Sequence, residues 1–142
     1  MTALGLHHIA LTVADFEVSI PWYEEVFGIR YQMEAPHEGG TGKLLADDGW
    51  NLVIVLHVHE RSQGEGFDER RTGLDHVGIS TPDRAALDAF AEHLVQVGGV
   101  KKVAVADRPL TQSPIAETPY GDILVFRDPD NIQLEAFAPP PR

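Results

Sequence analysis

The sequence predicts an α+β fold in which a βαβββ module occurs twice. Two pairs of similar segments support this prediction. The segment His7–Phe16 aligns without a gap on Asp75–Arg84, and Asp48–Val55 aligns on Asp128–Glu135. In each half, the first segment runs into a helical pattern that ends at glycine, and the second continues into a strand. A chain of 142 residues with this repeat is expected to be one domain made of two modules.

The first strand of each module alternates between an apolar face and a smaller polar face. The apolar faces, expected to pack under the helices, contain Ile9, Leu11 and Val13 in one module and Val77 and Ile79 in the other. The opposite faces contain His8, Ala10 and Thr12, and His76, Gly78 and Ser80. Neighbouring strand residues point to opposite sides, so His8 and His76 share the polar face, while His7 is expected at a solvent edge.

A helix is expected after each of these strands. In the first module, we expect Ser19 to cap the helix, Pro21 to lie in its first turn and Gly28 to end it. In the second module, residues 81–83 (Thr-Pro-Asp) are the start signal and residues 98–99 (Gly-Gly) the end.

Two segments rich in glycine and charge are expected to be loops, Glu34–Lys43 and Glu60–Gly73. The second contains the linker between modules. We therefore expect a first module over about residues 5–60, a linker over about 61–73 and a second module over about 74–138.

The last strand carries an acid among apolar residues. One face contains Ile132, Leu134 and Ala136, and the other contains Gln133, Glu135 and Phe137. A buried carboxylate without a partner is costly, and either a paired group or a bound metal ion removes that cost. His8, His76 and Glu135 thus lie on equivalent faces of three strands and form a facial triad that suits Fe(II), Mn(II), Zn(II) or Ni(II). The alternative is that each is an isolated polar strand residue.

The repeat also identifies a fourth position. Val55 is the counterpart of Glu135, and valine cannot bind a metal. His57 lies on the same face, two residues further on. It can be a fourth ligand one step out of register, a proton-transfer group or a polar rim residue, and we favour the last two. His59 is expected to be exposed to solvent.

Composition excludes several classes of function. The net charge of −11 argues against nucleic acid or an anionic membrane surface as a partner. The chain has no cysteine, so disulfides, thiolate metal sites and a cysteine nucleophile are excluded. No N-terminal segment resembles a signal peptide, and no stretch approaches the ~20 apolar residues of a membrane span. We therefore expect a cytoplasmic protein.

Three segments resemble the vicinal oxygen chelate superfamily: HHIALTVADFEVSIPWYEEVFG, LDHVGISTPD and VFRDPDNIQLEAF. This superfamily includes glyoxalase I, methylmalonyl-CoA epimerase, extradiol dioxygenases, fosfomycin-resistance transferases and bleomycin-resistance proteins. With the repeat, the resemblance covers nearly the whole chain. It implies a mixed sheet that curls into a cup around a divalent metal ion, with helices packed outside.

The resemblance also implies roles for residues. His8, His76 and Glu135 fall on the family's metal ligands. Members such as glyoxalase I carry a Glu or Gln ligand where Val55 stands, so the three-ligand pattern is closer to extradiol dioxygenases and fosfomycin-type transferases. By analogy with the extradiol enzymes, His57 and Tyr120 are the candidate proton-transfer residues. The expected apolar substrate pocket contains Trp50, Val53, Val55 and Phe137.

Two main functions follow from the resemblance. The favoured one is a metal-dependent dioxygenase, lyase or isomerase whose small organic substrate chelates the ion through neighbouring oxygens. The alternative is a bleomycin-resistance type of protein that binds a drug-sized molecule without converting it. A cup that has lost activity is a third possibility. A small-molecule partner and a homodimer are implied in either main case.

Overall fold

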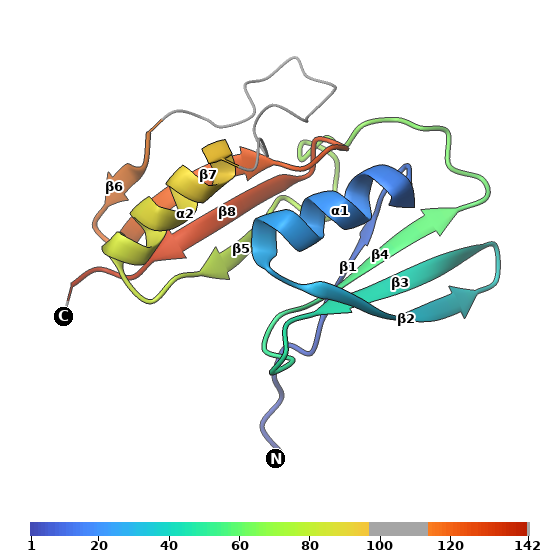
Figure 1. The fold of residues 1–142 in the computed structure, drawn as a ribbon, viewed down its shortest axis with the longest axis horizontal. Helices are drawn as coiled ribbons and strands as arrows, with labels where there is room; N and C mark the ends of the chain where they lie inside the picture. The colour runs from blue at the N-terminus through green and yellow to red at the C-terminus, as the bar shows by residue number, and fades with distance from the viewer. Residues whose placement is uncertain (97–113, 142) are drawn as a thin grey trace. The chain divides into compact units, whose positions relative to one another are not determined.

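The computed structural model describes residues 1–96 and 114–141, which form two compact units, Met1–Glu65 and Gly66–Arg142. Within the described residues, each unit has one helix and one four-stranded mixed sheet, so the α+β prediction is confirmed (Figure 1). Among the described residues, no helix is both long enough and apolar enough to cross a membrane.

The first unit has the predicted βαβββ order. Its sheet has the strand order β1-β4-β3-β2, with β1 parallel to β4 and the other neighbours antiparallel. The elements are β1 (Ile9–Thr12), α1 (Phe16–Phe27), β2 (Arg30–His37), β3 (Gly40–Ala46) and β4 (Val53–His59).

The second unit repeats this plan. Its strand order is β5-β8-β7-β6, and β5 is parallel to β8 as β1 is to β4. The elements are β5 (Val77–Ser80), α2 (Arg84–Gln96), β6 (Ala116–Thr118), β7 (Gly121–Arg127) and β8 (Gln133–Ala138).

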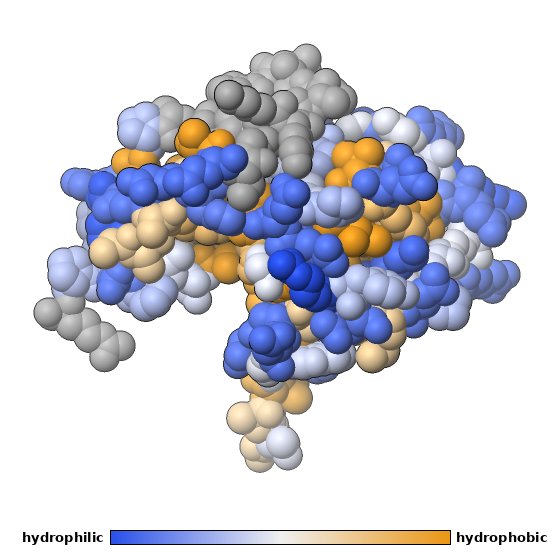
Figure 2. All heavy atoms as spheres, viewed as in Figure 1, coloured by the Kyte–Doolittle hydropathy of each residue, from blue (hydrophilic) through white to orange (hydrophobic). Residues whose placement is uncertain are grey.

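The predicted alternation of the strands is confirmed by burial. In β1, Leu11 is buried while Ala10 and Thr12 are exposed, and β8 alternates between half-buried and buried side chains. The helices close the cores with Trp22, Tyr23 and Val26 in one unit and Leu87 and Leu94 in the other. Outside the cores, exposed apolar side chains gather in the segment before β1, namely Met1, Leu4 and Leu6 (Figure 2).

The helix boundaries agree with the sequence in part. Gly28 ends α1 with φ of 68°, and the carboxylate of Asp83 accepts a hydrogen bond from the Ala86 amide at 2.8 Å at the start of α2. The prediction that Ser19 caps α1 is wrong, because Asp15 accepts from the Glu17 amide and starts the helix earlier. Ser19 is instead buried inside the helix, and Pro21 lies beyond its first turn. The predicted end of α2 at residues 98–99 lies outside the described residues.

The predicted loop at Glu34–Lys43 is wrong, and the predicted loop at Glu60–Gly73 is confirmed. Residues 60–73, all described, form no helix or strand. Residues 34–43 instead form most of a hairpin between β2 and β3, with Gly39 at φ of 80° in its two-residue turn. Strand β2 is at the sheet edge with mostly exposed side chains, so it carries no alternation that the sequence could reveal.

Candidate functional site

Two of the three predicted metal ligands lie next to each other in the second unit. His76 directly precedes β5, and Glu135 lies in β8 opposite Gly78. This register brings His76 Nε2 to 3.4 Å from Glu135 Oε2. The two side chains are 39% and 20% exposed, so the pair is open to a ligand.

The hydrogen bond of His76 to Asp75 fixes the tautomer of the ring. His76 Nδ1 lies 2.6 Å from Asp75 Oδ1, and a carboxylate oxygen accepts, so Nδ1 carries the hydrogen. With neutral His76, Nε2 therefore directs a lone pair toward the Glu135 carboxylate. Two acceptors at 3.4 Å repel each other unless a proton or a metal ion lies between them. This arrangement has the donor chemistry of a metal site.

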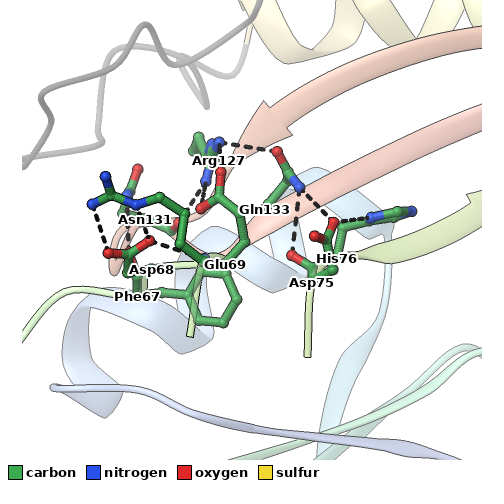
Figure 3. A network of polar contacts seen from close by, with 9 residues as sticks. Phe67, Asp68, Glu69, Asp75, His76, Arg127, Asn131 and Gln133 are labelled. Atoms are coloured by element: carbon green, nitrogen blue, oxygen red, sulfur yellow. Dashed lines mark hydrogen bonds and ion pairs between the residues drawn. The ribbon is translucent and has the colours of Figure 1, made fainter. Parts of the chain in front are cut away.

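A chain of polar contacts links Asp75 to Arg127 through Gln133 (Figure 3). Gln133 Nε2 donates to Asp75 Oδ1 at 3.1 Å, and Arg127 donates to Gln133 Oε1 at 3.0 Å. Arg127 is 1% exposed and is paired with Glu69 at 3.1 and 3.2 Å. Burial lowers the pKa of Arg127, while Asp128 and Asp75 raise it, and the guanidinium stays charged. Such outer contacts hold a histidine ligand in a fixed orientation.

The third predicted ligand, His8, belongs to the first unit. It is exposed just before β1, and its Nδ1 lies 2.8 Å from Nδ1 of His7. The strand registers are equivalent in the two units, because Ala10 pairs with Val55 as Gly78 pairs with Glu135. Val55, which is 5% exposed, thus occupies the position that the acid occupies in the other unit.

His57 lies in a group of three histidines in the first unit. Its ring centroid is 4.9 Å from that of His37 and 6.1 Å from that of His59, and His37 and His59 are 4.9 Å apart. Burial, followed by the neighbouring His37, His59 and His8, lowers the pKa of His57. The three rings line a cavity of about 280 Å³ together with Ala10, Leu11 and Thr12.

His37 is the residue of this group that sequence analysis did not single out. It lies at the end of β2, inside the segment predicted to be a loop. The available signal was the pattern HEGG, in which a two-residue turn brings His37 opposite Gly40. His59 is exposed, as predicted, and still belongs to the group.

The other predicted site residues are divided between the units. Val53 and Val55 are buried neighbours on β4, and Trp50 is 44% exposed in the turn before that strand. Phe137 is half-buried on β8, and Tyr120 is 64% exposed in the turn between β6 and β7.

The comparisons with known proteins agree with this architecture. The family model described as Glyoxalase/Bleomycin resistance protein/Dioxygenase superfamily matches residues 5–136. A crystal structure of a glyoxylase/bleomycin resistance protein/dioxygenase domain from Frankia sp. EAN1pec is 33% identical, with a TM-score of 0.80 over 97% of this chain and 93% of that one.

Two further proteins are informative. The trivalent organoarsenical cleaving enzyme of Thermomonospora curvata is 31% identical over 90 residues, which are 63% of this chain and 52% of that enzyme. The fosfomycin resistance protein FosX from Listeria monocytogenes, solved with Mn(II) and sulfate, is 19% identical, with a TM-score of 0.60 over 96% of this chain and 93% of that one, and shares the fold. The family match over most of the chain and the repeated βαβββ units lead to one conclusion: this protein belongs to the glyoxalase/bleomycin resistance protein/dioxygenase superfamily.

Proposed function

We propose that the protein is a metal-dependent enzyme whose small organic substrate offers two neighbouring oxygens to a divalent ion. His8, His76 and Glu135 are the proposed ligands. The observation that carries the proposal is the approach of the lone-pair nitrogen of His76 to the Glu135 carboxylate, at 3.4 Å. Membership of the superfamily supports it, as do the organoarsenical cleaving activity of one relative and the Mn(II) in the FosX structure.

The residues of the chain fit such an ion. Two imidazoles and one carboxylate suit Fe(II), Mn(II), Zn(II) or Ni(II), and Val55 adds no ligand in the first unit. The bound ion would act as a Lewis acid toward the substrate oxygens. Asp75 keeps the hydrogen on Nδ1 of His76, so that Nε2 remains a donor, and the contacts through Gln133 and Arg127 hold Asp75 in place.

The proposed proton-transfer groups are His57 and Tyr120, as the resemblance implies. The imidazoles of His37 and His59 lie beside His57. His57→Gln and Tyr120→Phe are the direct tests of these two roles. The predicted pocket residues also stay predictions, namely Trp50, Val53, Val55 and Phe137. Because the chain has no cysteine, the proposal does not extend to a substrate held by thiolates.

The first test measures Mn²⁺ binding to the untagged full chain by electron paramagnetic resonance. Mn²⁺ is chosen because it prefers sites that contain a carboxylate over purely imidazole sites. His76→Ala, Glu135→Gln and His8→Ala should each abolish strong binding without unfolding the protein. His93→Ala is the control, because it removes a histidine of α2 that is not among the proposed ligands, and it should bind as the unaltered chain does. Unchanged Mn²⁺ affinity in Glu135→Gln would show the site assignment to be wrong.

The second test distinguishes catalysis from binding without conversion. The metal-loaded protein is incubated with catechols while O₂ uptake is measured, and with 2-oxo-aldehyde thiol adducts while isomerisation is measured. Turnover that Glu135→Gln loses supports the enzyme. Tight binding of an apolar aromatic molecule to metal-free protein, without turnover of any substrate, would favour the bleomycin-resistance type of function instead.

The homodimer and the cytoplasmic location stay predictions from the resemblance and the composition. Light scattering of the purified chain measures the first of these.

A further inference from the structure

Three histidines from two strands are brought into one group by the sheet of the first unit. His37 on β2 is opposite Gly40 on β3, and Gly40 is opposite His59 on β4. Gly42, two residues along β3, is opposite His57. Directly paired residues point to the same side of a sheet, so the three imidazoles share one face, above two glycines.

The two glycines provide the space that the rings occupy. A Cβ added at Gly40 would meet the Val58 carbonyl oxygen and lie 2.8 Å from Cε1 of His37. A Cβ added at Gly42 would lie 2.7 Å from Cε1 of His57. Both distances are shorter than van der Waals contact, so any larger residue would displace a ring. The imidazoles therefore lie over the backbone of β3, because Gly40 and Gly42 have no side chain to occupy that space.

The tautomer of His37 leaves a lone pair on Nε2 that can bind a metal ion. Its Nδ1 lies 2.9 Å from the Glu38 carbonyl oxygen, which accepts, so Nδ1 carries the hydrogen and Nε2 carries the lone pair. This Nε2 is buried and has no hydrogen-bond partner among the described residues. A backbone carbonyl on one ring nitrogen and a vacant lone pair on the other is the usual state of a histidine that binds a metal through Nε2.

One nitrogen from each of His37, His57 and His59 lies within 4.8 Å of the others. Tetrahedral coordination with bonds of about 2.0–2.1 Å puts neighbouring nitrogens roughly 3.3 Å apart. The group therefore closes around an ion by small rotations of the rings, while the strands keep their register.

We propose that His37, His57 and His59 form a second metal site, for a late first-row divalent ion such as Zn²⁺, Ni²⁺ or Cu²⁺. Three imidazoles without a carboxylate suit these ions better than Mn²⁺ or Mg²⁺. The remaining coordination positions would be open to water or a small ligand from the cavity of about 280 Å³.

This site is separate from the one under Proposed function and does not depend on it. The two share no ligand. His8 interacts electrostatically with His57, but it is not one of the three imidazoles whose nitrogens lie within 4.8 Å of one another. Removing a ligand of one site therefore leaves the ligand set of the other complete, and the other site is expected to bind.

The test uses the untagged full chain with His76→Ala and Glu135→Gln, which removes two ligands of the first site. Zn²⁺ binding is measured by competition with a chromophoric chelator, and Co²⁺ binding by its visible absorption bands. We expect this double variant to bind one equivalent with tetrahedral Co²⁺ bands. Adding His37→Ala or His59→Ala should weaken Zn²⁺ binding by more than the roughly 10–100-fold that loss of an outer-shell contact costs.

Two further variants in that background separate ligation from a structural effect. His59→Cys supplies a thiolate and should retain the ion with a new sulfur-to-cobalt absorption band. His7→Ala, the matched control, should change nothing. Circular dichroism confirms folding of each variant. No Zn²⁺ bound by the folded double variant, or equal affinity with and without His37, would overturn the proposal.

Discussion

Val55 and Glu135 occupy the same position in the two units, one opposite Ala10 and the other opposite Gly78. These partners each lie two residues after a predicted histidine ligand, His8 in one case and His76 in the other. The repeat therefore contains two equivalent positions for a carboxylate, and the chain has an acid at one of them. At the other position, the apolar side chain of Val55 is 5% exposed.

Val55→Glu should place a carboxylate in the first unit at the position that Glu135 has in the second. In the second unit the same register brings a histidine and an acid to 3.4 Å, so the new carboxylate is expected to reach His8. Without metal, burial of the carboxylate should lower the free energy of unfolding by at least about 1–3 kcal/mol, which is the cost of burying a neutral polar group without a partner. Mn²⁺ should recover part of this loss, as measured by urea denaturation with and without the ion. Val55→Leu is the control, and equal Mn²⁺ stabilisation of both variants would contradict the prediction.

Asp75→Asn should weaken metal binding while the fold is retained. The change removes the charge that holds the hydrogen on Nδ1 of His76, and the Asp75 side chain is 67% exposed, so little core packing is lost. Loss of such an outer-shell partner costs about 10–100-fold in metal affinity, and we expect Mn²⁺ affinity to fall in that range. Asp48→Asn makes the same charge change in the other unit at an exposed site and serves as control. An affinity unaltered by Asp75→Asn would show that the contact does not support the ligand.

Gly121→Ala should destabilise the second unit strongly. Gly121 has φ of 146°, and an added Cβ would collide with the Phe137 ring and the Ala138 carbonyl oxygen. Backbone strain together with overpacking gives an expected loss of at least about 2 kcal/mol in the free energy of unfolding. Gly78→Ala is the control, because nothing lies within 4 Å of its added Cβ. Chemical denaturation measures both, and similar losses at the two glycines would argue against this account.

His57 should titrate below its ordinary pKa of 6.5 in metal-free protein. Above pH 6.5 the ring is neutral in both the folded and unfolded chain. As the pH falls through 6.5, the unfolded chain takes up a proton that the folded chain does not, so stability falls until the folded pKa is reached. NMR of the imidazole Cε1–H resonance measures the titration. His37→Ala should raise the His57 pKa and His93→Ala should not, whereas a midpoint above 6.5 in the unaltered protein would contradict the lowered pKa.

Local sequence was sufficient for the order of elements and for the choice of residues in the first proposed site. The repeat gives βαβββ twice, and alternation places His76 and Glu135 on matching faces, because both depend on residues close in the chain. The same logic makes Val55 the counterpart of Glu135, and the strand registers agree with it. Ser19 misled the helix start because both it and Asp15 are residue types that cap helices, and the buried helix face decided between them.

The sequence by itself thus determined the fold class and the repeated plan, and it selected His8, His76 and Glu135 as the proposed ligands. Tertiary structure alone decided which side chains meet: His37 joins His57 and His59 across β3, and Arg127 reaches Asp75 through Gln133. The physical reason is that periodicity records which face a residue takes within its own strand, whereas contacts between strands depend on pairing register. At the exposed edge strand β2, with no buried face, even that periodicity was missing.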